Sequence, residues 1–148
     1  MDETTCLEQV AGILVRAGLP FATRPDGGGY AVPLGEEMVF VEVEPSGEGS
    51  VLVRVECPVL QEIDPEGPGG AAALNVVHEL NLDHSFVKFT FDYGALVATY
   101  ELLGDHLRSE ELMHAIFRVG AASCIAAALA EETGGKRYAE VAAGWDDD

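Results

Sequence analysis

Two histidines near the middle of the chain have the residue types of a metal-binding motif but not its spacing. His78 is followed by Glu79, and the next histidine, His84, comes six residues after the first. A metalloprotease helix needs two histidines four residues apart, because only then does one helical face present both rings to a zinc ion. A separation of six residues rotates the two rings by roughly 240° about a helix axis. We therefore expect no metal and no metal-dependent catalysis in this segment.

The three cysteines also lack the pattern of a reactive or metal-binding site. Cys6, Cys57 and Cys124 are widely spaced and odd in number, so they predict neither a disulfide framework nor paired metal ligands. None lies in the electropositive setting that favours a thiolate nucleophile. We expect Cys57 and Cys124 to be small buried hydrophobic residues. The sequence thus predicts no catalytic residue and no cofactor, and unpaired thiols favour a reduced, cytoplasmic protein.

The composition is that of an acidic globular protein. The 148 residues carry a formal net charge of −18, and 48% of them are hydrophobic. Such a surface repels phosphate backbones and anionic lipid, so nucleic-acid binding is not expected. The longest uncharged apolar run, Val119 to Ala130, is shorter than the ~20 residues of a membrane-spanning helix, and the N-terminus lacks the pattern of a signal peptide. We expect one domain and no membrane association.

The spacing of apolar residues predicts three helices and five strands. Helices are expected from Thr4 or Thr5 to Gly18, around the stripe Ala73–Leu80, and from Ser109, with the part from Gly120 to Ala130 apolar or small on all sides. The predicted strands span residues 30–34, 38–44, 50–57, 85–91 and 95–100.

Because the connections between these strands are short, neighbouring strands should pair antiparallel. The predicted fold is therefore α+β, in the order helix, three strands, helix, two strands, helix. Its antiparallel five-stranded sheet should carry the helices on one face. The domain is expected to cover residues 1–135, and residues 136–148 are expected to form a frayed acidic tail.

Strict alternation in the strands indicates a sheet that is covered on one face only. Valines occupy every second position from Val39 to Val43 and from Val51 to Val55. If these valines face the core together with residues 87, 89 and 91, large apolar side chains remain on the opposite face. A bound partner segment, a second subunit or the tail could cover this face, and these alternatives are not exclusive. The four residues are Met38, Phe40, Leu52 and Phe86.

The predicted elements, taken in order, resemble a known family. The resemblance runs from the first helix to about Thr133 and is densest in four segments: Leu74 to Asn81, Phe86 to Phe89, Ala95 to Leu102 and Ser109 to Leu112. These patterns resemble the YbjN-like proteins and the related type III secretion chaperone-like domains. The resemblance implies a non-enzymatic, typically dimeric protein that binds extended segments of other proteins. Some members of the family are labelled sensory transduction regulators.

The sequence therefore predicts a chaperone or adaptor that binds an extended partner segment through Met38, Phe40, Leu52 and Phe86. One alternative is a regulatory or structural module that recognises a single folded partner through a broad patch. Another is a small enzyme, which would require a deep pocket containing His78, His84 or a cysteine with a perturbed pKa.

A homodimer is expected as well. The last predicted helix is apolar on more sides than one sheet can cover. Ile125 and Leu129 point away from its main stripe, so we expect them to contact either a second subunit or the second helix.

Overall fold

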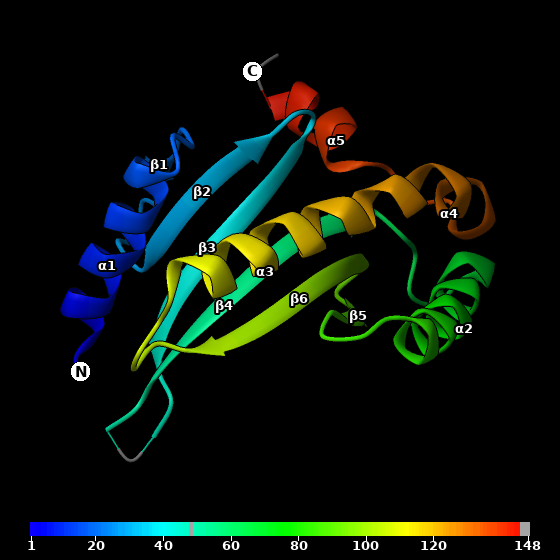
Figure 1. The fold of residues 1–148 in the computed structure, drawn as a ribbon. Coiled ribbons are helices and arrows are strands. Elements are labelled where there is room, and N and C mark those ends of the chain that lie inside the picture. Colours follow the sequence, from blue (N-terminus) through cyan, green and yellow to red (C-terminus); the bar gives the residue numbers. More distant parts are fainter. Residues whose placement is uncertain (48, 146–148) are drawn as a thin grey trace.

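The computed structural model describes residues 1–47 and 49–145, apart from the side chains of Cys124 and Trp145. Over these residues the chain forms a sheet of six strands in the spatial order β1-β2-β3-β4-β6-β5, with every neighbouring pair antiparallel (Figure 1). The elements in chain order are α1 (Glu3–Arg16), β1 (Ala22–Thr23), β2 (Gly29–Leu34), β3 (Glu37–Pro45), β4 (Val51–Leu60), α2 (Pro68–Asp83), β5 (Lys88–Asp92), β6 (Ala95–Leu103), α3 (Ser109–Ala121), the 3-10 helix η1 (Ala122–Ile125), α4 (Ala126–Thr133) and α5 (Tyr138–Trp145).

The α+β class and the antiparallel pairing are confirmed, whereas the predicted count of five strands is wrong. The sixth strand, β1, has only two residues, Ala22 and Thr23, which pair with Ala31 and Tyr30 of β2. A strand of two residues has no alternation that could distinguish it from a loop. Sequence patterning therefore does not separate this strand from the loop around it.

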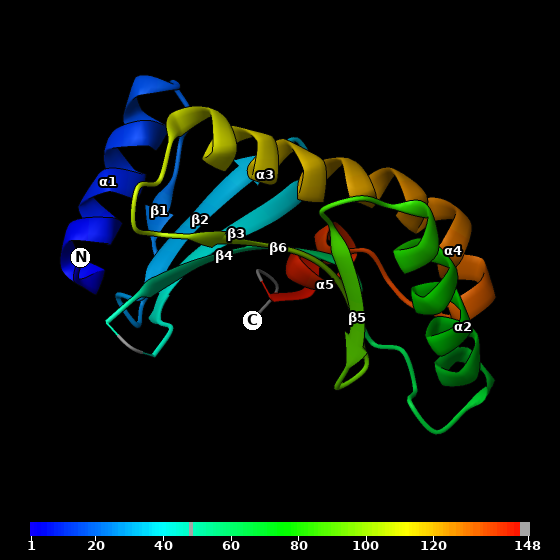
Figure 2. The ribbon, with the colours of Figure 1, turned by 60° about the horizontal axis from the view of Figure 1, so that its bottom comes forward.

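The core lies between the sheet and α3, on the face that the valines occupy. Val39, Val41, Val53 and Val55 have no solvent-exposed surface. α3 crosses this face of β3, β4 and β6 (Figure 2). Burial of so many β-branched and aliphatic side chains supplies the main driving force for folding. The residues that α3 buries against the sheet are Leu112, Ala115, Ile116 and Val119.

The single long helix expected from Ser109 is broken into α3, η1 and α4. Ser123 donates a hydrogen bond from Oγ to the carbonyl of Gly120 at 2.6 Å, and such a bond to the preceding turn competes with the helical pattern and bends the helix. α3 and α4 meet at 46°. No single helix in the described residues is long and apolar enough to cross a membrane, and only α3 and α4 together, as this bent pair, meet the length and composition of a span.

The prediction that all helices pack on one face is also wrong, because α5 lies on the face opposite α3 (Figure 2). The chain leaves α4 at Gly134, whose φ of 75° is left-handed. Lys136 then forms a two-bond β-bridge with Gln61, just beyond β4. Residues 136–145 therefore do not fray as predicted. The remaining tail residues, 146–148, lie outside the described part of the chain.

Candidate functional site

Three of the four predicted binding residues lie on the sheet face opposite α3, which we call the open face. Met38, Phe40 and Leu52 alternate with the buried valines and are half-buried. Phe40 is partly covered: the Arg24 guanidinium lies 5.4 Å from the centre of its ring, and the Tyr138 ring of α5 meets it edge-on at 6.2 Å. The C-terminal segment thus covers part of this face, as one of the sequence-based alternatives allowed.

Charged side chains separate Phe40 from Leu52 on the open face. Arg54 pairs with Glu44 at 2.8 Å and lies 3.7 Å from Glu56, while Arg24 pairs with Glu42. Burial raises the pKa of Glu56, and the negative charge of Glu42 adds to the effect. The apolar residues therefore form two groups instead of one strip.

The second apolar group joins Leu52 to a residue that sequence reasoning missed. Leu52 is opposite Leu103 in the register of β4 and β6, and Leu103 is 64% exposed. Leu103 lies beyond the predicted end of its strand at residue 100, so the predicted boundary excluded it. Alternation along a longer strand is the signal that could have found it.

Phe86 lies away from the other three predicted residues. It precedes β5 and has a φ of 71°, so it does not follow the strand alternation on which its placement depended. Its ring stacks on Tyr100 with 6.1 Å between centres and meets His114 of α3 at 6.0 Å. Tyr100 is opposite Val55, and therefore belongs to the α3 side of the sheet. Phe86 nevertheless stays 70% exposed.

Beside Phe86, half of β6 has no strand partner on its outer edge. β5 pairs with β6 only from Ala95 to Thr99, whereas β6 continues to Leu103. The N–H of Gly104 donates to Val51 of β4 at 2.7 Å, so the alternation of an antiparallel ladder directs the N–H and C=O groups of Glu101 and Leu103 away from β4. Within the described residues, no strand pairs with these groups.

The two flanks of this free edge differ in chemistry. On the α3 side lie the rings of Phe86, Tyr100 and His114. On the open face lie Leu103 and the ion pair between Lys88 and Glu101, whose atoms are 3.3 Å apart. A strand added here would place alternate side chains on an aromatic flank and on a mixed flank.

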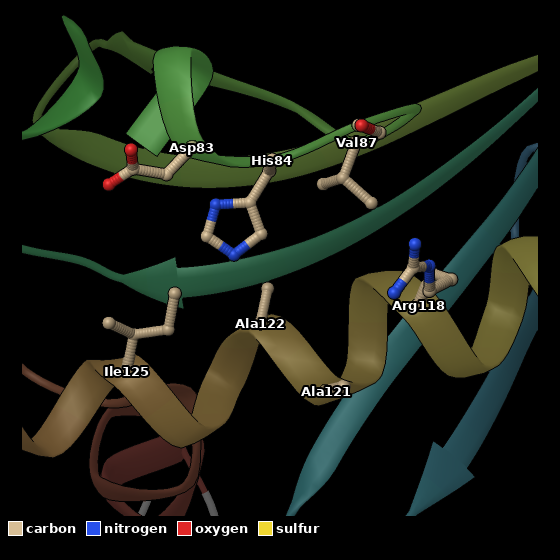
Figure 3. Close-up of a pocket in the computed structure, with 8 residues that line it drawn as sticks. Asp83, His84, Val87, Arg118, Ala121, Ala122 and Ile125 are labelled. Carbon is tan, nitrogen blue, oxygen red and sulfur yellow. The ribbon is translucent and has the colours of Figure 1, made fainter. Parts of the chain in front are cut away.

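A cavity of about 280 Å³ lies close to the aromatic flank, between the end of α2 and the break in α3 (Figure 3). The His84 ring points across it toward Ala122, and its Nδ1 lies 3.0 Å from the carbonyl oxygen of Leu80. Among the side chains that the structure describes, neither a cysteine nor His78 lines this cavity. Burial, with a smaller contribution from Glu37, raises the pKa of Cys57 to about 12, which disfavours the thiolate. Burial likewise raises the pKa of Cys6, so neither of the two described cysteine side chains is activated as a nucleophile.

The predicted dimer contacts lie near the same cavity. Ile125 lines it opposite Asp83, and Leu129 belongs to α4, which packs against α2. Both side chains are half-buried against the core. This placement fits contact with the second helix, one of the two expected alternatives. Among the described residues, no three His, Cys, Asp or Glu side chains are grouped to hold a metal ion.

Residues 5–141 match the family of T3SS (YopN, CesT) and YbjN peptide-binding chaperone 1. The chain belongs to this family. The match includes Lys136, Arg137 and Tyr138, so the family pattern extends into the segment that was expected to be a tail. No curated protein matches the chain significantly.

Three solved structures have a similar fold. An uncharacterized protein from Methanothermobacter thermautotrophicus is 17% identical, with a TM-score of 0.60, over 86% of this chain and 97% of the other. The ExsC–ExsE complex contains a chain that is 19% identical, with a TM-score of 0.57, over 83% of this chain and 92% of the other. YbjN from E. coli, described as a putative transcription regulator, is 12% identical, with a TM-score of 0.57, over 87% of this chain and 93% of the other. At these identities the likeness concerns the fold.

Proposed function

We propose that this protein is a non-enzymatic chaperone or adaptor that binds an extended segment of a partner protein by adding it as a strand to β6. The observation that carries the proposal is the outer edge of β6 from Tyr100 to Leu103, which pairs with no strand in the described part of the chain and has Phe86 exposed beside it. Membership of a peptide-binding family and the fold shared with ExsC, which was solved in complex with ExsE, support a protein partner. Unpaired, buried Cys6 and Cys57 suit a reduced, cytoplasmic setting.

Strand addition suits this edge because the backbone of the partner supplies most of the recognition. The open N–H and C=O groups of Glu101 and Leu103 can bond any extended chain, while the flanking side chains select its sequence. Phe86 and Leu103 are the apolar contacts that a bound segment would cover. Leu52 lies next to Leu103 and extends this surface, whereas Met38 and Phe40 belong to the region that α5 adjoins.

A second candidate is recognition of a folded partner, including another copy of this chain, through α2. Leu74 and Leu82 are exposed and eight residues apart, a rotation of roughly 80° about the helix axis, so both belong to one broad side of the helix. A helix face with two exposed leucines matches a folded surface better than an extended peptide. We propose this face, instead of Ile125 and Leu129, as the main contact of a homodimer.

The test uses peptides selected against the folded protein from a displayed library of random segments. Burying Phe86 in a complex contributes roughly 1.5–3 kcal/mol of transfer free energy, reduced by the ordering of the bound segment. We therefore expect Phe86→Ser to weaken binding of the selected peptide about tenfold, which corresponds to about 1.4 kcal/mol. The unfolding midpoint should change little because the ring is largely exposed.

Leu82→Ser is the matched control, because Leu82 is 73% exposed and lies on α2, away from β6. This variant should bind the peptide as the wild type does. Equal affinity of the wild type and Phe86→Ser would contradict the proposed site, and loss of affinity in Leu82→Ser alone would favour the α2 surface.

A further inference from the structure

The C-terminal segment is docked on the domain through contacts that resemble those of a bound peptide. It follows α4, passes the end of the sheet at Gln61 and reaches the open face as α5 (Figure 2). Three successive residues, Lys136, Arg137 and Tyr138, make three different kinds of contact with the domain.

The first contact is made by the backbone. The N–H of Gln61 donates to the carbonyl of Lys136 at 2.7 Å, and the N–H of Lys136 donates to the carbonyl of Gln61 at 2.8 Å. These two bonds do not depend on the side chain at position 136, so any extended segment could make them. The Lys136 ammonium group adds an exposed ion pair with Glu62 at 3.1 Å.

The second contact neutralises a buried carboxylate. Glu37 is only 8% exposed, and its Oε1 pairs with the Arg137 guanidinium. Its Oε2 and the Nε of Arg137 are buried and have no hydrogen-bond partner among the described residues. A buried carboxylate requires a cation, yet this pairing leaves polar atoms unsatisfied. The Glu37 carboxylate therefore needs a cationic partner, but Arg137 does not satisfy all of its hydrogen-bonding capacity.

The third contact is aromatic. The ring of Tyr138 meets the ring of Phe40 edge-on, with 6.2 Å between their centres, and covers part of this apolar side chain on the open face.

The sequence contains a signal for the burial of Glu37. This residue occupies the same alternation as Val39 and Val41, so it belongs to the buried side of the strand.

We propose that residues 136–145 are an intramolecular occupant of a peptide site formed by Gln61, Glu37 and Phe40, and that partner segments displace them. The inference goes beyond the proposed site at β6 and names the chemistry of the partner at this end of the sheet. The displacing segment is extended at the position that pairs with Gln61. It carries an arginine or lysine for Glu37 and an aromatic ring for Phe40. The net charge of −18 attracts such a cationic segment.

An intramolecular occupant lowers the apparent affinity for an added peptide, because only the fraction of molecules with an open site can bind. The probe is a labelled synthetic peptide with the sequence of residues 134–145. The full-length double variant Arg137→Ala, Tyr138→Ala loses two of the three docking contacts. We expect it to bind the probe at least about tenfold more tightly than the wild type does.

The matched control removes the same residue types elsewhere. Arg16 and Tyr93 are both exposed, so Arg16→Ala, Tyr93→Ala should bind the probe as weakly as the wild type. Adding Glu37→Gln to the opened variant should abolish most of the gain, because the cation site is lost. Equal probe affinity in the opened variant and the wild type, or a gain that survives Glu37→Gln, would overturn the proposal.

A measurement on the wild type avoids any effect of the substitutions on folding. Saturating probe should accelerate hydrogen exchange in residues 138–145 by displacing α5, and should leave the amides of Glu101 and Leu103 unchanged. Unchanged exchange in α5 would overturn this inference without affecting the proposed function at β6. Failure of peptides to protect Glu101 and Leu103 would instead refute strand addition and leave the C-terminal site standing.

Discussion

Asn81 pairs through its side-chain amide with both backbone polar groups of Phe89. Its Oδ1 accepts the Phe89 N–H at 2.7 Å, and its Nδ2 donates to the Phe89 carbonyl at 3.0 Å. The outer edge of β5 is therefore closed at its centre by a residue of α2. An exposed strand edge is a template for pairing with another chain, so this contact blocks β5 and leaves the far half of β6 as the free edge beside it.

Asn81→Ala is predicted to destabilise the fold. The substitution removes two hydrogen bonds and leaves the backbone groups of Phe89, a residue that is almost fully buried, without their partner. The free energy of unfolding in urea should fall by about 1–3 kcal/mol. Asn75→Ala is the control, since Asn75 is an exposed asparagine on the same helix, and its effect should lie within about 0.5 kcal/mol of zero. Similar effects of the two substitutions would show that the contact with Phe89 is unimportant.

The main features of the fold were predictable because they depend on local periodicity. Alternation in β3 and β4 assigned the buried face correctly, and the apolar stripe of α3 identified the helix that covers it. Family membership followed from the order of these elements. Each of these patterns extends over many residues, so one irregular position does not obscure it.

The features that were mispredicted depend on backbone geometry or on tertiary contacts. The positive φ of Phe86 takes it out of the strand pattern and places its ring on Tyr100. Residues 136–145 carry charges and follow two glycines, which is typical of a tail, but Glu37 and Phe40 hold them against the sheet. These partners are about 100 residues away in sequence, a separation at which local patterns carry no information.

Cys57 is predicted to be inert in the folded protein. It has no exposed surface, and burial, assisted by Glu37, raises the pKa of its thiol to about 12. Below pH 9.0 an alkylating reagent should modify Cys57 only after denaturation, as followed by peptide mass spectrometry. Rapid modification of the native protein would contradict its burial.

The same shift predicts a loss of stability in alkali. The unfolded thiol ionises near pH 9.0 and the folded thiol near pH 12, so above pH 9.0 the unfolded state gains stability by releasing a proton. The contribution of Cys57 is complete below pH 9.0 and disappears as the pH rises toward 12. Cys57→Ala should unfold with a weaker dependence on pH across this window, and an unchanged dependence would count against the shift.

Light scattering at tens of micromolar is predicted to give the mass of a homodimer. If the exposed face of α2 forms the interface, Leu82→Glu should reduce the mass to that of a monomer. This monomeric variant should unfold in urea at about the same midpoint as wild-type protein that has been diluted until it is monomeric. Ile125→Glu should instead lower that midpoint, because Ile125 packs against the core. A monomeric wild type would refute the dimer, and a dimeric Leu82→Glu variant would remove α2 from the interface.

The most direct test of strand addition at β6 is hydrogen exchange at two amides, Glu101 and Leu103, with and without a peptide selected from the displayed library. A strand added to β6 would accept hydrogen bonds from both N–H groups, so their exchange should slow by at least about tenfold on binding. The neighbouring amides of Tyr100 and Leu102 point toward β4 and serve as internal references, with little change expected. Tight peptide binding that leaves the exchange of Glu101 and Leu103 unchanged would contradict the account.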